Sequence, residues 1–165
     1  MPVVGLEPSC VSVFRDELLN LFPRDPYAKK LAASAMTLSE FIRREPAFPM
    51  PSLTRKALVQ AHCHHKSVMR FDAEDAVLRA IGLDVEHPDS GCCGMAGAFG
   101  FQKEHYDVAM RVGERVILPA VREAAEGTLI IANGFSCREQ IAQATGRHPL
   151  HLAEVLKLAM EGSGS

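Results

Sequence analysis

Short apolar runs alternate with longer amphipathic stretches along almost the whole chain. The apolar runs that predict buried strands cover residues 3–6, 56–62, 83–87 and 128–133. Apolar residues at three- and four-residue intervals predict helices over residues 12–22, 27–45, 71–82, 105–127, 137–146 and 150–162. Because strands that alternate with helices usually pair in parallel, we expect an α/β fold: a three-layer domain with a mainly parallel sheet between helices.

Local signals add detail to this expectation. Asp72 stands where it can cap the helix over residues 71–82, and Gly82 stands where that helix should stop. Pro119 is expected to interrupt the helix over residues 105–127, because a proline inside a helix lacks the N–H that the helix needs. We expect one domain over residues 1–161, followed by a flexible tail, GSGS, at residues 162–165.

The overall composition excludes several classes of protein. With 47 % hydrophobic and 23 % charged residues, the chain is typical of a folded globular protein. A net charge of −2 predicts no basic surface for nucleic acid. The apolar runs are too short to span a bilayer, so we expect no transmembrane segment, although peripheral membrane association through partners stays compatible with the sequence. The first ten residues lack the features of a secretory signal, which favours the cytoplasm, where thiols stay reduced.

Cysteines follow the predicted strands in a regular way. Cys10, Cys63, the neighbouring Cys92 and Cys93, and Cys137 each come shortly after the carboxyl end of a strand. In an open α/β sheet these carboxyl ends meet at one edge, where the ligand crevice lies. Helices that start at the same edge direct free N–H groups there, which favours the thiolate form that binds metal. We therefore expect distant thiols to gather at one edge of the sheet.

The adjacent pair Cys92 and Cys93 sits in the glycine-rich segment DSGCCGMAGAFGF, residues 89–101. Neighbouring cysteines do not easily bond to each other, because the small ring strains the disulfide geometry. Glycines allow the backbone to turn tightly beside a bulky ligand. Two neighbouring thiolates suit two metal atoms, or two corners of one cluster, so this segment predicts an iron–sulfur or other metal site.

Other interpretations of the same residues remain open. A single cysteine is often only a small buried hydrophobic residue. One of the cysteines could act as a nucleophile with His62, His64 or His65 as its base. A structural zinc site is a third interpretation, although the chain lacks the tight CxxC pairs that usually build one.

Four segments of the chain resemble the cysteine-rich CCG domain: GLEPSC, AHCHHK, SGCCGMAGAFGF and ANGFSCREQI. This domain occurs in one of the subunits of heterodisulfide reductase and in the iron–sulfur subunit of glycolate oxidase. It also occurs in anaerobic glycerol-3-phosphate dehydrogenase and at the C-terminal end of large FAD-linked oxidases, which the chain resembles most. The resemblance extends over the whole expected domain.

The resemblance implies a set of site residues. Cys63, Cys92, Cys93 and Cys137 match the metal ligands of the CCG pattern, which implies a cluster of the 4Fe–4S type, and Cys10 is implied as a further cofactor-binding residue. The residues expected to surround the cluster with hydrogen bonds or charge are His62, His64, Gly94, Lys66 and Arg138. Two departures stand out. Gly134 replaces a cysteine that commonly precedes the last ligand, and one motif is present where the family usually has two, which implies a piece of a larger protein.

The function implied is electron transfer within a flavin-linked dehydrogenase of 2-hydroxy acids such as D-lactate or glycolate. FAD is expected in the parent protein and not in this chain. The implied partners are a flavin-containing domain or subunit and another iron–sulfur domain. The electron acceptor is left open: it could be a quinone, a disulfide or a soluble carrier. The domain itself is expected to carry electrons without substrate chemistry. The alternatives are a disulfide or thiol reductase that works at a cluster, and a zinc-stabilised or metal-free structural or interaction domain.

Overall fold

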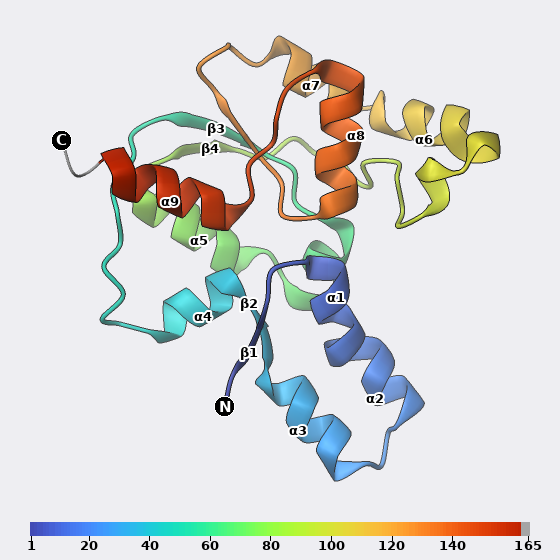
Figure 1. Ribbon diagram of the computed structural model, residues 1–165, viewed down its shortest axis with the longest axis vertical. Coiled ribbons are helices and arrows are strands. Elements are labelled where there is room, and N and C mark those ends of the chain that lie inside the picture. Colours follow the sequence, from blue (N-terminus) through green and yellow to red (C-terminus); the bar gives the residue numbers. More distant parts are fainter. Residues whose placement is uncertain (163–165) are drawn as a thin grey trace.

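The computed structural model describes residues 1–162, which form a mixed α/β fold with two small parallel sheets (Figure 1). The strands are β1 (Val3–Gly5), β2 (Ala35–Thr37), β3 (Lys56–Val59), β4 (Asp84–Glu86) and β5 (Leu129–Ile131). β1 pairs only with β2, and β3 lies between β4 and β5, with Ala57 opposite Val85 and Leu129. All these pairs are parallel, so the α/β class is confirmed, but the strands form two sheets instead of one.

The helices are α1 (Pro8–Ser12), α2 (Leu18–Leu21), α3 (Pro26–Ser34), α4 (Leu38–Arg44), α5 (Asp72–Ile81), α6 (Tyr106–Gly113), α7 (Ile117–Glu123), α8 (Phe135–Thr145) and α9 (Leu152–Gly162). Wider π-helical turns span Val13–Glu17 and His65–Met69, and 3₁₀ turns span Phe99–Phe101 and Lys103–His105. Helix α9 includes Gly162, and the rest of the expected flexible tail, residues 163–165, lies outside the described residues.

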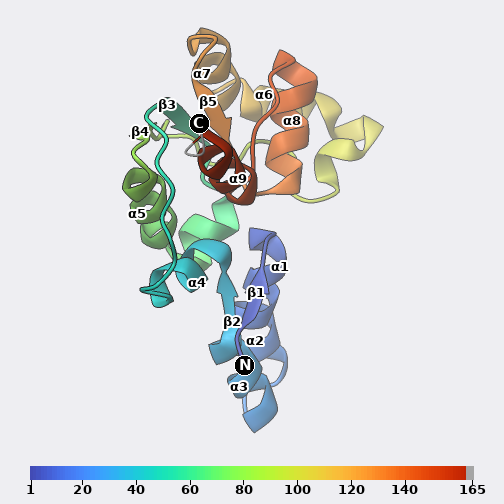
Figure 2. The same cartoon turned by 60° about the vertical axis from the view of Figure 1, so that its left-hand side comes forward.

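The three-stranded sheet has helices on both faces, so the expected three layers are confirmed (Figure 2). Alternate residues of a strand point to opposite faces. Ala57 and Val59 of β3 therefore pack with α5 and α9, whereas Leu58 packs with α7 and α8. Both cores are made mainly of buried aliphatic side chains, whose removal from water is the main stabilising contribution.

The single helix expected over residues 27–45 is wrong. The chain leaves α3 at Ala35, forms β2 beside β1 and then enters α4. Thr37 caps α4 in a capping box with Glu40, in which each side chain accepts a hydrogen bond from the other residue's backbone N–H. The helical spacing of the apolar residues does not reveal this break, because β2 forms only by pairing with β1. In that pairing Val3 lies opposite Ala35, which follows it by 32 residues in the chain.

Two smaller expectations are corrected and one is confirmed. Phe71, not Asp72, is the N-cap of α5, and Asp72 is the first helical residue. Gly82 ends α5 in the left-handed conformation at φ 101°, as expected. The break near Pro119 falls earlier, between α6 and α7, and Pro119 lies in the first turn of α7, where its missing N–H would have no helical partner.

The N-terminal lobe, residues 1–44, projects away from the three-stranded sheet (Figure 1); its α4 packs on α5 and α9, and its α1 packs on the π-helical turn His65–Met69. A buried polar network crosses this junction. The Asn133 side-chain amide donates to Oε1 of Glu74 at 2.7 Å, and the Leu152 N–H donates to Oδ1 of Asn133 at 2.9 Å. Ser39 of α4 lies beside Glu74, and complete burial raises the pKa of this carboxyl group to about 7.

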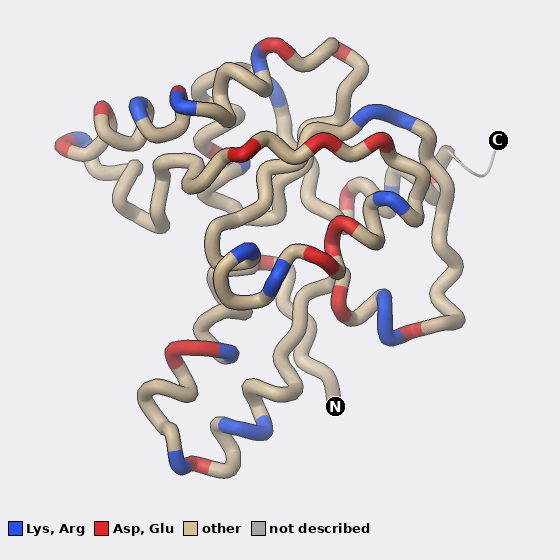
Figure 3. The backbone as a smooth tube through the Cα atoms, turned by 180° about the vertical axis from the view of Figure 1, so that it is seen from behind, with Lys and Arg blue, Asp and Glu red and all other residues tan. Residues whose placement is uncertain are grey.

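Acidic and basic residues are interleaved over helices and loops of both parts of the molecule (Figure 3), which agrees with the small net charge of −2. Among the described residues, no helix combines the length and the apolarity needed to cross a membrane.

Candidate metal centre

Four of the five cysteines line one cavity at the carboxyl edge of the three-stranded sheet. Cys63 follows β3, Cys92 and Cys93 follow β4, and Cys137 stands in the first turn of α8, after β5. The cavity has a volume of about 270 Å³ and is also lined by Ser9, His62, His64, Ala96, Gly97 and Ser136. Parallel strands thus bring together thiols that lie up to 74 positions apart, from Cys63 to Cys137, as expected for an open α/β sheet.

The four thiols influence one another electrostatically: Cys63 interacts with Cys92, Cys92 with Cys93, and Cys93 with Cys137. Interaction with Cys92, and secondarily burial, raises the pKa of Cys63, and interaction with Cys137 and Cys92 raises that of Cys93. The pKa of Cys92 is lowered, because the neighbouring thiols of Cys63 and Cys93 stabilise its thiolate. Among the three, Cys92 therefore ionises first.

Backbone N–H groups are directed at the same sulfur atoms. The Gly94 N–H donates to Sγ of Cys92 at 3.3 Å, and the Ala96 N–H also hydrogen-bonds this sulfur. Further backbone hydrogen bonds come from Met95 to Cys93 and from His64 to Cys63. Such donors favour negative charge on sulfur and are among the features that set the reduction potential of iron–sulfur centres.

The turn after Cys93 depends on glycine. Gly94 has φ +104°, and a Cβ there would overlap the carbonyl oxygen of Ala109 in α6. Ala96 and Gly97 also have positive φ angles of 43° and 65°. The backbone therefore curls around Cys92, which brings its N–H groups to the sulfur, and only a residue without Cβ fits against α6 at position 94.

His62 occupies space that Gly134 leaves free. A Cβ at Gly134, the N-cap of α8, would overlap Cδ2 of the His62 ring. The ring is buried, with 7 % exposure, and burial lowers its pKa. Its Nδ1 accepts the His64 N–H at 3.2 Å, so the neutral ring carries its proton on Nε2. The position where the CCG pattern commonly has a cysteine is thus filled by an imidazole from another strand end.

Gly134→Ala is expected to displace the His62 ring and to lower the free energy of unfolding by about 1–3 kcal/mol, the usual cost of overpacking. Denaturant unfolding measures the loss, and the NMR resonances of the His62 ring report the displacement. Gly91→Ala is the matched control, because nothing lies within 4 Å of its Cβ. Unshifted His62 resonances in Gly134→Ala would contradict the packing described.

Three of the other residues expected near the site, Cys10, Lys66 and Arg138, do not line the cavity, whereas His64 does. Cys10 is exposed on α1 and does not line the cavity, whereas its neighbour Ser9 does. Lys66 does not line it either, and its Nζ donates to the carbonyl of Ser90 at 3.5 Å. Arg138 pairs with Glu154 at 3.7 Å outside the cavity. His64 lines the cavity, and its Nδ1 lies 3.4 Å from Oγ of Ser12.

Sequence reasoning did not identify two hydroxyl groups that line the cavity. It also did not identify a carboxylate that hydrogen-bonds two segments of the cavity wall. Ser9 and Ser136 each precede a cysteine by one residue, which was the only signal for them. Glu7 accepts the Ser9 hydroxyl at 2.8 Å and the Phe135 N–H at 2.7 Å. It thereby joins the start of α1 to the start of α8, and nothing in the local sequence indicates this contact.

Four thiols are a donor set that iron–sulfur clusters use. Within residues 1–162, no group of three histidine, cysteine or acidic side chains converges closely enough to hold one metal ion. Zinc requires four donors about 2.0–2.3 Å from one point. An iron–sulfur cluster presents several iron atoms, each bound by its own thiolate, so four thiols spread along the wall of a cavity can serve it. The chemistry of these residues therefore suits an iron–sulfur cluster.

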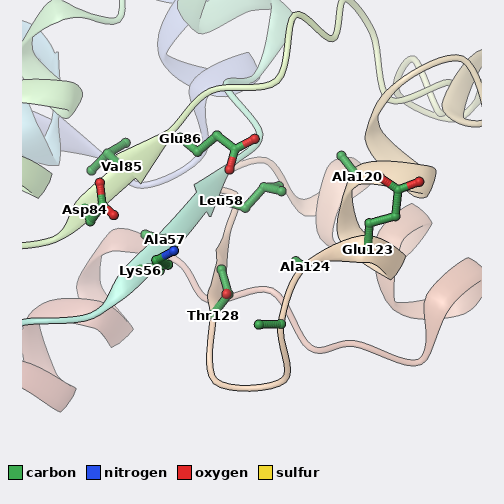
Figure 4. Close-up of a pocket in the computed structure, with 11 residues that line it drawn as sticks. Lys56, Ala57, Leu58, Asp84, Val85, Glu86, Ala120, Glu123, Ala124 and Thr128 are labelled. Atoms are coloured by element: carbon green, nitrogen blue, oxygen red, sulfur yellow. The ribbon is translucent and has the colours of Figure 1, made fainter.

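A larger cavity, of about 540 Å³, lies between the strands β3 and β4 and the end of α7 (Figure 4). It is lined by Lys56–Leu58 of β3, by all of β4, by α7 and by the loop that follows it, and no cysteine is among its lining residues. Asp84, Glu86 and Glu123 surround it with carboxylates (Figure 4). Ligand sites in open α/β sheets lie at the carboxyl ends of the strands, so the smaller thiol-lined cavity is the candidate site.

Comparison with known proteins gives distant relatives among oxidoreductases. No protein-family profile and no solved structure matches the chain. D-2-hydroxyglutarate dehydrogenase of Pseudomonas putida is 25 % identical over 158 residues, which cover 94 % of this chain and 15 % of that protein. The Escherichia coli dehydrogenase of the same name is 24 % identical over 163 residues, 95 % of this chain and 16 % of that protein.

One subunit of the anaerobic glycerol-3-phosphate dehydrogenase of Escherichia coli is 25 % identical over 158 residues, 92 % of this chain and 39 % of that protein. The chain thus spans well under half the length of each of these relatives. Distant homology therefore supports two of the resemblances seen in the sequence. One is to a 2-hydroxy-acid oxidoreductase, and the other is to an anaerobic glycerol-3-phosphate dehydrogenase. The chain is a distant homologue of part of D-2-hydroxyglutarate dehydrogenase and of part of this glycerol-3-phosphate dehydrogenase.

Proposed function

We propose that this chain is an electron-transfer domain that holds a 4Fe–4S-type cluster on Cys63, Cys92, Cys93 and Cys137. The observation that carries the proposal is the gathering of these four thiols around one cavity, with backbone N–H groups directed at three of them. When bound, such a cluster supplies one-electron oxidation and reduction. Cys10, exposed on α1, has no assigned part in the proposal and is tested separately.

The residues of the chain hold the site and set its electrostatics. Cys93 and Cys137 are buried in the core beneath α7 and α8, which excludes water from that side. Cys63 and Cys92 are half-buried, so electrons would enter or leave on their side. N–H groups of the loop after Cys93 stabilise thiolate charge, and the Nε2–H of His62 is available as a further donor in the cavity wall.

The parent protein would be a flavin-linked dehydrogenase of a small 2-hydroxy acid, with FAD bound outside this chain. Homology to D-2-hydroxyglutarate dehydrogenase and to an anaerobic glycerol-3-phosphate dehydrogenase supports this assignment. Its partners would be a flavin-containing domain or subunit and another iron–sulfur domain, in the cytoplasm. The domain would pass electrons between them and have no substrate chemistry of its own.

The other interpretations have less support. A mononuclear zinc site needs converging donors, which the described side chains do not provide. In the nucleophile interpretation, His65 cannot serve as the base, because its ring packs edge-to-face on Phe71 at 4.9 Å and does not line the cavity.

Anaerobic reconstitution with ferrous iron and sulfide tests the proposal. We expect iron and acid-labile sulfide in equal amounts, about four of each per chain for a 4Fe–4S cluster, and a broad visible absorption that bleaches on reduction. Protein whose thiols are alkylated beforehand serves as the control and should stay colourless. A colourless reconstituted protein that instead binds one zinc ion per chain would contradict the proposal.

A further inference from the structure

The imidazole ring of His62 is held firmly in the wall of the thiol-lined cavity. Its Nδ1 accepts the His64 N–H at 3.2 Å, and the His64 ring stands edge-on to it, with the ring centroids 5.3 Å apart. On another side the ring packs against the backbone of Gly134, so closely that a Cβ there would overlap it. With only 7 % exposure, the ring has little room to turn away from this position.

The second ring nitrogen of His62, Nε2, faces open space in this wall. No described residue accepts a hydrogen bond from it. Among the described side chains, the nitrogen and oxygen atoms that are fully enclosed without a partner belong to His65, Glu74 and His105, so Nε2 of His62 is not enclosed. The space that its N–H can reach is the cavity that His62 lines together with four cysteines.

The ring also takes the place of a side chain at position 134. Its Nε2 lies 3.2 Å from the point where a Cβ of residue 134 would stand, and its Cδ2 would overlap that Cβ. The CCG pattern that the chain resembles commonly has a cysteine at this position. A hydrogen-bond donor therefore stands where a further thiolate would otherwise reach the cavity.

We propose that His62 donates its Nε2–H to the cluster in place of a fifth thiolate, and that this hydrogen bond raises the reduction potential of the site. The inference rests on the proposed function, because it requires a cluster in the thiol-lined cavity. Reduction adds negative charge to a cluster. A hydrogen bond to the cluster stabilises that charge, whereas another thiolate would repel it.

The same geometry argues against His62 as a ligand of the metal. A neutral imidazole binds metal through its unprotonated nitrogen, and in His62 that nitrogen is Nδ1, which already accepts the His64 N–H. Ligation through Nε2 would require the ring proton to move to Nδ1, and the His64 N–H would then lose its acceptor. His62 therefore acts on the cluster as a donor.

Redox titration of reconstituted variants tests the inference. His62→Leu removes the N–H and keeps an apolar side chain in its place, whereas His62→Gln keeps an amide N–H that can reach the same space. We expect His62→Leu to be reduced about tenfold less favourably than the wild type, which lowers the potential by about 59 mV for one electron. His62→Gln should recover most of this shift. Both variants should keep the iron content of the wild type.

His148→Leu is the matched control, because His148 is exposed and does not line the cavity. It should keep the potential of the wild type. The visible absorption, followed during anaerobic titration with a reductant, gives each potential. Iron content and circular dichroism show whether each variant is loaded and folded, and His62→Ala replaces His62→Leu if the latter does not fold.

Equal potentials in the wild type and His62→Leu would overturn the inference, and so would an equal shift in His62→Leu and His62→Gln, which would indicate packing alone. Loss of iron from a folded His62→Leu protein would also overturn it, because His62 would then be a ligand. A wild type without iron would overturn the proposed function and this inference with it. Full iron content with an unchanged potential would overturn the inference alone.

Discussion

Cys93→Ala is expected to remove almost all cluster-bound iron from the reconstituted protein. Cys93 lies between Cys92 and Cys137 and is only 3 % exposed, so its burial lets no water or other side chain replace the lost sulfur. Loss of a mere hydrogen-bond partner of a metal ligand costs roughly 10- to 100-fold in affinity. Loss of a ligand should cost more. Iron and acid-labile sulfide per chain, measured after gel filtration, give the result.

Cys10→Ala is the control, because Cys10 is exposed and does not line the cavity. It should keep the iron content of the wild type, and a loss would restore the expectation that Cys10 binds the cofactor. Circular dichroism during heating shows whether Cys93→Ala is folded. If it is not, Cys63→Ala replaces it, since Cys63 is only half-buried. A folded Cys93→Ala protein with the iron content of the wild type would contradict the proposed cluster site.

Glu74→Gln is expected to stabilise the protein above pH 7 and to have little effect below pH 4.5. Burial raises the pKa of Glu74 from its ordinary value of 4.5 to about 7, so the native state retains a proton that the unfolded state releases. The wild type therefore loses stability as the pH rises from about 4.5 to about 7. At 1.36 kcal/mol per pKa unit, the loss amounts to about 3 kcal/mol.

Glutamine has nearly the same shape and no charge, and its carbonyl oxygen can still accept the Asn133 amide. The free energy of unfolding, measured by denaturant titration of both proteins at pH 4.5, 6 and 8, gives the difference at each pH. That difference should grow from near zero to about 3 kcal/mol in favour of Glu74→Gln. Glu123→Gln, at an exposed position, is the control and should show no such trend. A difference that does not change with pH would contradict the assigned burial.

The Glu74 network matters because of where it lies. It connects α4 of the N-terminal lobe, α5, the end of β5 and the start of α9. Buried polar groups cost free energy unless they are hydrogen-bonded, so Asn133 and Ser39 must stay in place beside it. The network therefore couples the attachment of the N-terminal lobe to the same strand end that leads to Cys137.

The sequence by itself determined the parts that follow from local pattern. Apolar runs and amphipathic periods predicted β1, β3, β4, β5 and most helices, and their alternation predicted parallel pairing in a layered fold. The general rule for parallel sheets then placed Cys63, Cys92, Cys93 and Cys137 at one edge. The resemblance of the cysteine segments named the same four residues.

Tertiary structure decided what depends on distant segments. Residues 35–37 have helical spacing, yet they form β2 because they pair with β1. His62 fills the space left by Gly134, and Lys66 and Arg138 make their contacts outside the cavity, which no local pattern indicates. Periodicity records which face of an element is buried, but not which element covers it. The contacts between elements therefore became known only from the folded chain.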